Sequence, residues 1–157
     1  MTASTDQAPP AAAEGAWWQR LPEALRSPAA AERLVRDYVD HSAAEDLAER
    51  GADELVAAVA SHVEAGAQRA PGTAVVRTVE GMTSGTRTRP TTVEVVTDDM
   101  PFLVDSLTSA LTVLGRGIVS VAHPRLAARR DDGGRLLELR PAEGATPGAE
   151  VEAWIRV

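Results

Sequence analysis

The chain has 157 residues with 16 basic and 23 acidic side chains, which gives a formal net charge of -7. This length suits one ordinary domain with a real core, or a small domain plus an arm. All 16 basic residues are arginines scattered along the chain, and there is no cysteine. The composition therefore excludes disulfides, thiolate chemistry and catalysis by lysine, and it argues against nucleic acid as a partner.

The N-terminal residues 1–15, MTASTDQAPPAAAEG, lack a basic start and a continuous apolar stretch. They predict a disordered tail rather than a secretory signal. No apolar run in the chain approaches the roughly 18 residues that a membrane span requires. We therefore expect a soluble, cytoplasmic protein without a membrane partner.

Residues 16–69 form a predicted helical segment. The stretch AWWQRLPEALRS at 16–27 suits a short apolar anchor. Ser27 followed by Pro28 is typical of an N-cap and first helical position, which predicts a helix to about His41.

Further helices are expected before residue 69. Ser42 and Glu45 fit a capping box for a brief helix that ends at Gly51. Asp53 is expected to cap the next helix, which ends near Gly66 and shows apolar residues at helical spacing. Those apolar residues are Leu55, Val56, Val59, Ala60 and Val63.

From Pro71 onward the pattern changes to that of a sheet. The stretches 73–79 and 91–97 read as strands because they are rich in valine and threonine, and 80–90 reads as a loop. A helix follows, with a stripe of apolar side chains and a natural stop at Gly115. The stripe consists of Leu103, Leu107, Ala110, Leu111 and Leu114.

The last third of the chain predicts more strands. Residues 117–130 read as a long strand, DDGG at 131–134 as a tight turn and 135–140 as the returning strand. Residues 141–149 read as a loop, and 150–157 alternate like one more strand.

Together these elements predict an α+β fold, in which a helical segment precedes a β-α-β-β sheet domain at residues 70–157. The last strand has no polar residues after it. We therefore expect an incomplete sheet with unpaired edges and an uncovered apolar face, which includes Val151, Ala153 and Ile155, and hence self-association.

The stretch TDDMPFLVDS at 97–106 carries the main candidate site residues. Asp98 and Asp99 suit capping of the helix, with Pro101 in its first turn. Alternatively, Asp98, Asp99 and Asp105 could bind the ammonium group of an amino acid while the helix start binds its carboxylate. A catalytic carboxylate pair is the weakest alternative, because nothing nearby supplies a nucleophile or an oriented base.

The remaining motifs indicate neither a catalytic nor a metal or cofactor site. His41, His62 and His123 are isolated and lack the spacing of metal ligands. The stretch GRGIVS at 115–120 lacks the third glycine and the strand-to-helix context of a dinucleotide site. We therefore predict no catalytic residue, no metal and no cofactor in this chain.

Several stretches resemble the N-terminal region of the large NAD-specific glutamate dehydrogenases of bacteria. They are YVDHSAAEDLAER at 38–50, RAPGTAVVRTV at 69–79, VEVVTDDMPFLVDSLTSALTVLGRGIVSVAHPRL at 93–126 and EAWIRV at 152–157. The resemblance implies an ACT-like, ferredoxin-like βαββ domain, truncated at its C-terminal end. It also implies a parent enzyme that uses NAD to convert L-glutamate to 2-oxoglutarate and ammonia.

In that family the catalytic lysine and the nucleotide-binding domain lie beyond the region that this chain resembles. The resemblance therefore implies a regulatory or assembly region that is not catalytic by itself. Its expected partners are the remainder of the dehydrogenase chain, further copies of itself and an amino-acid effector. The alternative is a free-standing amino-acid-binding or oligomerisation module with the same fold.

Overall fold

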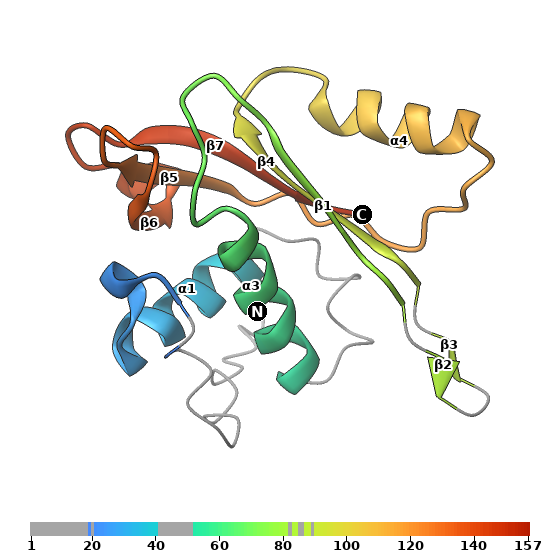
Figure 1. The fold of residues 1–157 in the computed structure, drawn as a ribbon, viewed down its shortest axis with the longest axis horizontal. Helices are drawn as coiled ribbons and strands as arrows, with labels where there is room; N and C mark the ends of the chain where they lie inside the picture. Colours follow the sequence, from blue (N-terminus) through green and yellow to red (C-terminus); the bar gives the residue numbers. More distant parts are fainter. Residues whose placement is uncertain (1–18, 20, 41–51, 82, 85–86, 89) are drawn as a thin grey trace, which may run out of the picture.

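The computed structural model describes residues 19, 21–40, 52–81, 83–84, 87–88 and 90–157. A five-stranded antiparallel sheet has helix α4 on one face and helices α1 and α3 on the other (Figure 1). This is the α+β fold that the sequence predicts. The expected tail at 1–15, the tryptophans at 17 and 18 and the helix at 42–51 lie outside the described residues.

The sheet has the strand order β1-β4-β7-β5-β6. Its strands are β1 (Val75–Val79), β4 (Thr92–Asp98), β5 (Arg125–Arg130), β6 (Leu136–Pro141) and β7 (Glu150–Arg156). Because β4 and β5 are both antiparallel to β7, they run parallel to each other on either side of it. Helix α4 (Leu103–Val113) connects them, which makes a split βαβ unit of the ferredoxin-like kind.

Two stretches differ from their predicted structure. The expected loop at 80–90 contains a small hairpin of β2 (Thr83–Ser84) and β3 (Arg87–Thr88). The expected strand at 117–130 is a strand only from Arg125 onward. Pro124 has no N–H to donate to a ladder, and before it only Ala122 forms an isolated bridge, with Arg156.

The hairpin of β5 and β6 forms where DDGG predicts it. The carboxylate Oδ1 of Asp131 accepts the backbone N–H groups of Gly133, at 3.0 Å, and of Arg135, at 2.9 Å. Gly134 has φ +82°, a conformation that glycine adopts without steric cost. A short 3-10 turn, η3 (Ala142–Gly144), follows β6.

Helix α1 (Pro28–Asp40) begins as predicted, since Ser27 Oγ accepts the N–H of Ala30 at 3.2 Å. The short turn η2 (Glu23–Leu25) precedes it. Helix α3 (Ala52–Ala65) begins one residue before Asp53. The side chain of Asp53 lies outside the described part of the chain, so its capping role stays a prediction.

The larger part of the core lies between the sheet and helices α1 and α3. Trp154 of β7 is fully buried at its centre, among apolar side chains of both helices and four strands. Gly66, just after α3, lies so close to the Trp154 ring that an added Cβ would collide with it. The main buried partners are Leu21, Leu34, Tyr38, Val59, Val63, Val96, Leu126 and Leu136.

The opposite face of the sheet carries a smaller core under α4. Val95, Ala153 and Ile155 are buried there, and Leu103 and Leu107 of α4 pack against them. Burial of a side chain such as Ile155 contributes about 1.5–3 kcal/mol.

The expectation of an uncovered face with Ala153 and Ile155 is therefore wrong. Strand β7 inserts between β4 and β5, so it has a neighbour on both sides, and α4 covers its apolar face. The edges of the sheet are β1 and β6 instead. Helices α1 and α3 share one core with the sheet. The division into a helical segment at 16–69 and a domain at 70–157 stays a prediction.

Candidate functional site

Asp98 is the last residue of β4, and its carboxylate forms an ion pair with Arg69. The atoms Oδ1 of Asp98 and Nη2 of Arg69 lie 2.8 Å apart, and the Arg69 side chain is 2% exposed. In the sheet, Asp98 lies opposite Glu152 of β7. Residues directly opposite in a ladder share a face, so Asp98 points toward the α3 side of the sheet.

Asp99 has a different partner, Arg125 at the start of β5. Its Oδ2 lies 2.8 Å from Nε and 2.7 Å from Nη2 of that arginine. The backbone N–H of Asp99 donates to the carbonyl of Val151 at 3.2 Å and extends the β4–β7 pairing. Asp98 and Asp99 are therefore held by separate arginines.

Asp105 lies in the first turn of α4 and is exposed to solvent. In the part of the chain that the structure describes, it forms no ion pair. The structure thus does not gather the three predicted carboxylates around one shared partner. Asp105 alone keeps a carboxylate that is open to a ligand.

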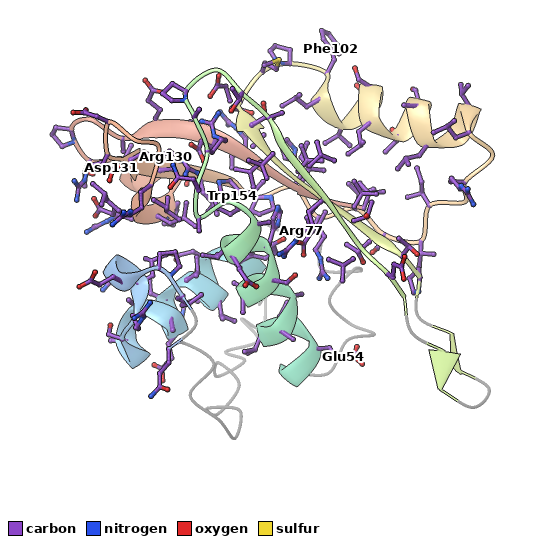
Figure 2. The ribbon with its side chains drawn as sticks, in the orientation of Figure 1. Glu54, Arg77, Phe102, Arg130, Asp131 and Trp154 are labelled. Atoms are coloured by element: carbon purple, nitrogen blue, oxygen red, sulfur yellow. The ribbon has the colours of Figure 1, made fainter. Side chains whose placement is uncertain are left out.

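The predicted cap of α4 is wrong. The N-cap residue is Phe102, which has φ +66° and no side-chain capping bond. Asp98 and Asp99 pair with arginines instead. The carbonyl of Phe102 accepts the N–H of Ser106 at 2.9 Å. A left-handed conformation at a residue other than glycine costs about 1–2 kcal/mol. The Phe102 side chain is 75% exposed and lies at the outer start of α4 (Figure 2).

A buried network joins Glu152 to two arginines. Glu152 is 1% exposed, and its Oε1 accepts Nε of Arg69 at 3.2 Å and Nη2 of Arg69 at 2.7 Å. Arg130 donates Nε to Oε1 at 2.7 Å and Nη2 to Oε2 at 2.9 Å. Burial alone would lower the pKa of Arg69, but Glu152 and Asp98 raise it overall. Such charge-assisted bonds satisfy both carboxylate oxygens.

The same arginines tie three segments of backbone together. Arg69 Nη1 donates to the carbonyl of Thr73 at 2.8 Å. Arg130 Nη1 donates to the carbonyls of Gly66, at 2.9 Å, and Gly134, at 3.0 Å. One cluster therefore joins the end of α3, the β5–β6 turn and the end of β4. Figure 2 shows Arg130, with Asp131 next to it, beside the hairpin.

A second buried carboxylate, Glu94 of β4, also lies between two arginines. Its Oε2 accepts Nε and Nη2 of Arg77 at 3.0 and 2.7 Å, and its Oε1 lies 3.4 Å from Nε of Arg156. Arg77 also donates to the hydroxyl of Ser61 on α3 at 2.7 Å. Figure 2 shows Arg77 between the sheet and α3.

Histidine 62 is a buried structural residue. Its Nε2 lies 3.2 Å from the carbonyl oxygen of Val95, and its Nδ1 lies 2.8 Å from the hydroxyl of Tyr38. A carbonyl can only accept, so Nε2 carries the proton and Nδ1 accepts from Tyr38. Burial lowers the pKa of His62 from 6.5 to about 4, although Glu94 and the bond to Val95 act in the opposite direction.

These buried pairs could not be read from motifs. The position of Glu152 could have been predicted from strand alternation. It lies two residues before the buried Trp154 on the same strand, so both side chains point to the same face, into the core. Its partner Arg69 follows a helix and gives no such signal. The sequence hypothesis missed both.

A cavity of about 610 Å³ lies at the other end of β4 from Asp98. It opens where β4 begins and β7 ends, next to the C-terminal end of α4 and the segment after it. Residues from both helical layers line it. They are Tyr38, Leu55, Ala58, Thr78, Pro90–Val93, Leu111, Gly115–Ser120, Ala122, Arg156 and Val157.

Metal ligands and membrane spans are absent from the described ranges. Within them, no group of three or more histidine and carboxylate side chains could hold a metal ion. None of the described helices is both long and apolar enough to cross a bilayer.

The chain matches a known protein family. The protein-family model described as "Glutamate dehydrogenase, ACT1 domain" matches residues 34–157. The match spans the sheet, α3, α4 and most of α1. No solved structure matches the chain.

Proposed function

The chain belongs to the ACT1-domain family of glutamate dehydrogenase, and from that premise we propose that it is the regulatory and assembly region of an NAD-specific enzyme. The parent reaction would convert L-glutamate and NAD to 2-oxoglutarate, ammonia and NADH. The single observation that carries this proposal is the match across residues 34–157. The bacterial origin and the cytoplasmic location that the resemblance implies belong to the same proposal.

We propose that this chain does not catalyse the reaction by itself and holds no NAD. It contains no lysine, so it cannot supply a lysine acid–base group. Its buried carboxylates, Glu94 and Glu152, are held in arginine pairs rather than presented to a substrate. Purified chain mixed with glutamate and NAD should show no rise in NADH absorbance above the blank, and turnover after removal of contaminating enzyme would contradict this.

An amino-acid effector is proposed to bind at the start of α4, near Asp98, Asp99 and Asp105. The exposed carboxylate of Asp105 can accept the ligand ammonium group. The side chain of Arg125, which pairs with Asp99 and is 56% exposed, can bind the ligand carboxylate. The carboxylate of Asp98 is held by Arg69, so Asp98 would contribute to this site only by positioning the adjacent Asp99.

Calorimetric titration tests this site. Glutamate, aspartate, leucine and arginine would each be titrated into wild-type protein, Asp105→Asn and the control Asp132→Asn, whose side chain is exposed in the β5–β6 turn. We expect one of these amino acids to bind the wild type and the control, and to bind Asp105→Asn at least about tenfold more weakly, since one charged hydrogen bond is lost. Equal affinity for all proteins would contradict the site.

Self-association is the second part of the proposal, and exposed apolar side chains around α4 support it. Phe102 is 75% exposed, Val113 86%, Leu114 71% and Val119 76%. Exposed apolar side chains of this size are typical of interaction surfaces. The same observation favours the second candidate function, an oligomerisation module, in which this surface contacts another copy or the remainder of the dehydrogenase chain.

A further inference from the structure

The cavity at the start of β4 has the dimensions of a small-molecule site. Its volume of about 610 Å³ falls in the range of ligand pockets, roughly 300–1,000 Å³. It is separate from the effector site proposed above, because Thr92 and Val93 line it whereas Asp98 ends the same strand. No sequence motif pointed to it.

Among the described side chains, the charges around the cavity have one sign. The described charged side chains that line it are Arg116 and Arg156, and no described carboxylate side chain lines it. Within the described residues Arg116 forms no ion pair. Arg156 lies 3.4 Å from Glu94, a carboxylate that also pairs with Arg77 at 2.7 Å. In a chain with net charge -7, this location therefore favours an anion.

The rest of the wall is largely apolar and incompletely buried. Leu55 comes from α3, Val93 from the start of β4 and Leu111 from α4. Ile118 is 37% exposed and Val119 is 76% exposed, although both line the cavity. A ligand with a branched apolar body would remove these side chains from water, which stabilises the complex by roughly 25 cal/mol per Å² of apolar surface buried.

We propose that this cavity binds a small apolar carboxylate that lacks an ammonium group, such as a branched-chain 2-oxo acid. Arg116 binds the carboxylate, and the walls enclose the hydrocarbon part. An amino acid fits less well, because its ammonium group would lose water without a carboxylate side chain to accept its hydrogen bonds. This site does not depend on the effector site near Asp105.

Calorimetry with three isosteric probes tests the inference. The probes are 4-methyl-2-oxopentanoate, leucine and the neutral 4-methyl-2-oxopentanamide. The wild-type protein should bind the oxo acid at least tenfold more tightly than leucine, about the loss expected for one unpaired charged group, and should give no heat with the amide.

Two substitutions test separately the charge of Arg116 and the free volume of the cavity. Arg116→Gln should weaken binding of the oxo acid at least about tenfold. Gly117→Leu should weaken binding, because Gly117 lines the cavity and a larger side chain there reduces the space for a ligand. A Cβ at Gly117 meets no neighbouring atom within 4 Å, so the substitution does not disturb the core. Arg135→Gln and Gly144→Leu are the matched controls, since neither residue lines the cavity, and both should retain wild-type affinity.

Three results would overturn the inference. They are no heat from the oxo acid with the wild type at millimolar concentration, equal binding of the amide, and unchanged binding by Gly117→Leu. If Arg116→Gln leaves oxo-acid binding unchanged, this site fails, whereas a loss of leucine binding in Asp105→Asn bears only on the effector site. Loss of oxo-acid binding in Arg116→Gln alone, with Asp105→Asn unaffected, supports this site independently.

Discussion

Arg69 and Glu152 are 83 positions apart in the sequence, yet their side chains form an ion pair with 2.7 Å between Nη2 and Oε1. Arg69 follows α3, and Glu152 lies on the central strand β7. The pair therefore joins the segment after α3 to the middle of the sheet. Through Asp98, which contacts the same Nη2, it also reaches the strand end that precedes the proposed effector site.

The substitution Glu152→Gln should destabilise the protein strongly. It removes the carboxylate that Arg69 and Arg130 share, so Arg130 loses its ion pair and Arg69 keeps only the one with Asp98. The two arginine side chains are 2% and 9% exposed. Leaving buried charges without a partner costs about 3–5 kcal/mol. Urea unfolding measures this loss. The control Arg135→Gln breaks an ion pair that is largely exposed and should cost no more than about 1 kcal/mol, and equal losses for both variants would contradict the role of the network.

The close contact between Gly66 and Trp154 predicts that Gly66→Ala is destabilising. The added methyl group would collide with the indole ring and lie 3.1 Å from Cγ2 of Val96. Overpacking of this kind costs about 1–3 kcal/mol. Thermal and urea unfolding should show that loss, whereas Gly144→Ala, which meets only open space, should stay within about 0.5 kcal/mol of the wild type.

Stability should fall on mild acidification because of His62. The pKa of this residue is lowered from 6.5 to about 4 in the folded protein by burial, so the folded state binds fewer protons than the unfolded state between these pH values. The contribution of the neutral ring is fully present above pH 6.5 and is lost as the pH falls toward 4. At 1.36 kcal/mol per pH unit the total is about 3 kcal/mol.

Nuclear magnetic resonance of the His62 Cε1 carbon measures this directly. The signal in the folded protein should titrate near pH 4, and the same carbon in urea-unfolded protein should titrate near 6.5. A folded-state midpoint near 6.5 would show that the ring is accessible to water and that its bonds to Tyr38 and Val95 do not hold it neutral.

Helix periodicity and strand alternation were sufficient to predict most elements of the fold. The Ser27-Pro28 start of α1, the stripe of α4 and the DDGG turn depend on local sequence, and the structure has them. The position of β7 between β4 and β5 depends on long-range pairing. No local pattern reports it, and an uncovered face was therefore expected.

The candidate site shows the same limit. Asp98 and Asp99 look like caps because they precede a helix, and short polar residues there usually accept backbone N–H groups. Arg69 and Arg125 come from other elements and bind both carboxylates. Each arginine places a full positive charge against the carboxylate, which a backbone N–H does not. The two aspartates therefore pair with arginines instead of capping the helix.

Self-association should depend on the exposed end of α4. In a Val113→Thr, Leu114→Gln double variant, polar atoms replace side chains that are 86% and 71% exposed, so folding stability should change by less than about 0.5 kcal/mol for each. Sedimentation equilibrium should show weaker association than in the wild type. The control Ala57→Ser changes an exposed side chain on α3, which lies on the other face of the sheet from α4, and should associate like the wild type. If the double variant and the control associate equally, the surface around α4 is not the interface.

The response of the enzyme to amino acids tests the regulatory role most directly. The glutamate dehydrogenase that carries this region would be assayed for NADH formation at saturating glutamate and NAD, with aspartate, leucine and arginine added in turn. We expect at least one of them to change the rate of the wild type and of Asp132→Asn, and Asp105→Asn to need at least about tenfold more of it while keeping the basal rate. The same dose–response curve for all three proteins, or no response to any amino acid, would contradict a regulatory role for the start of α4.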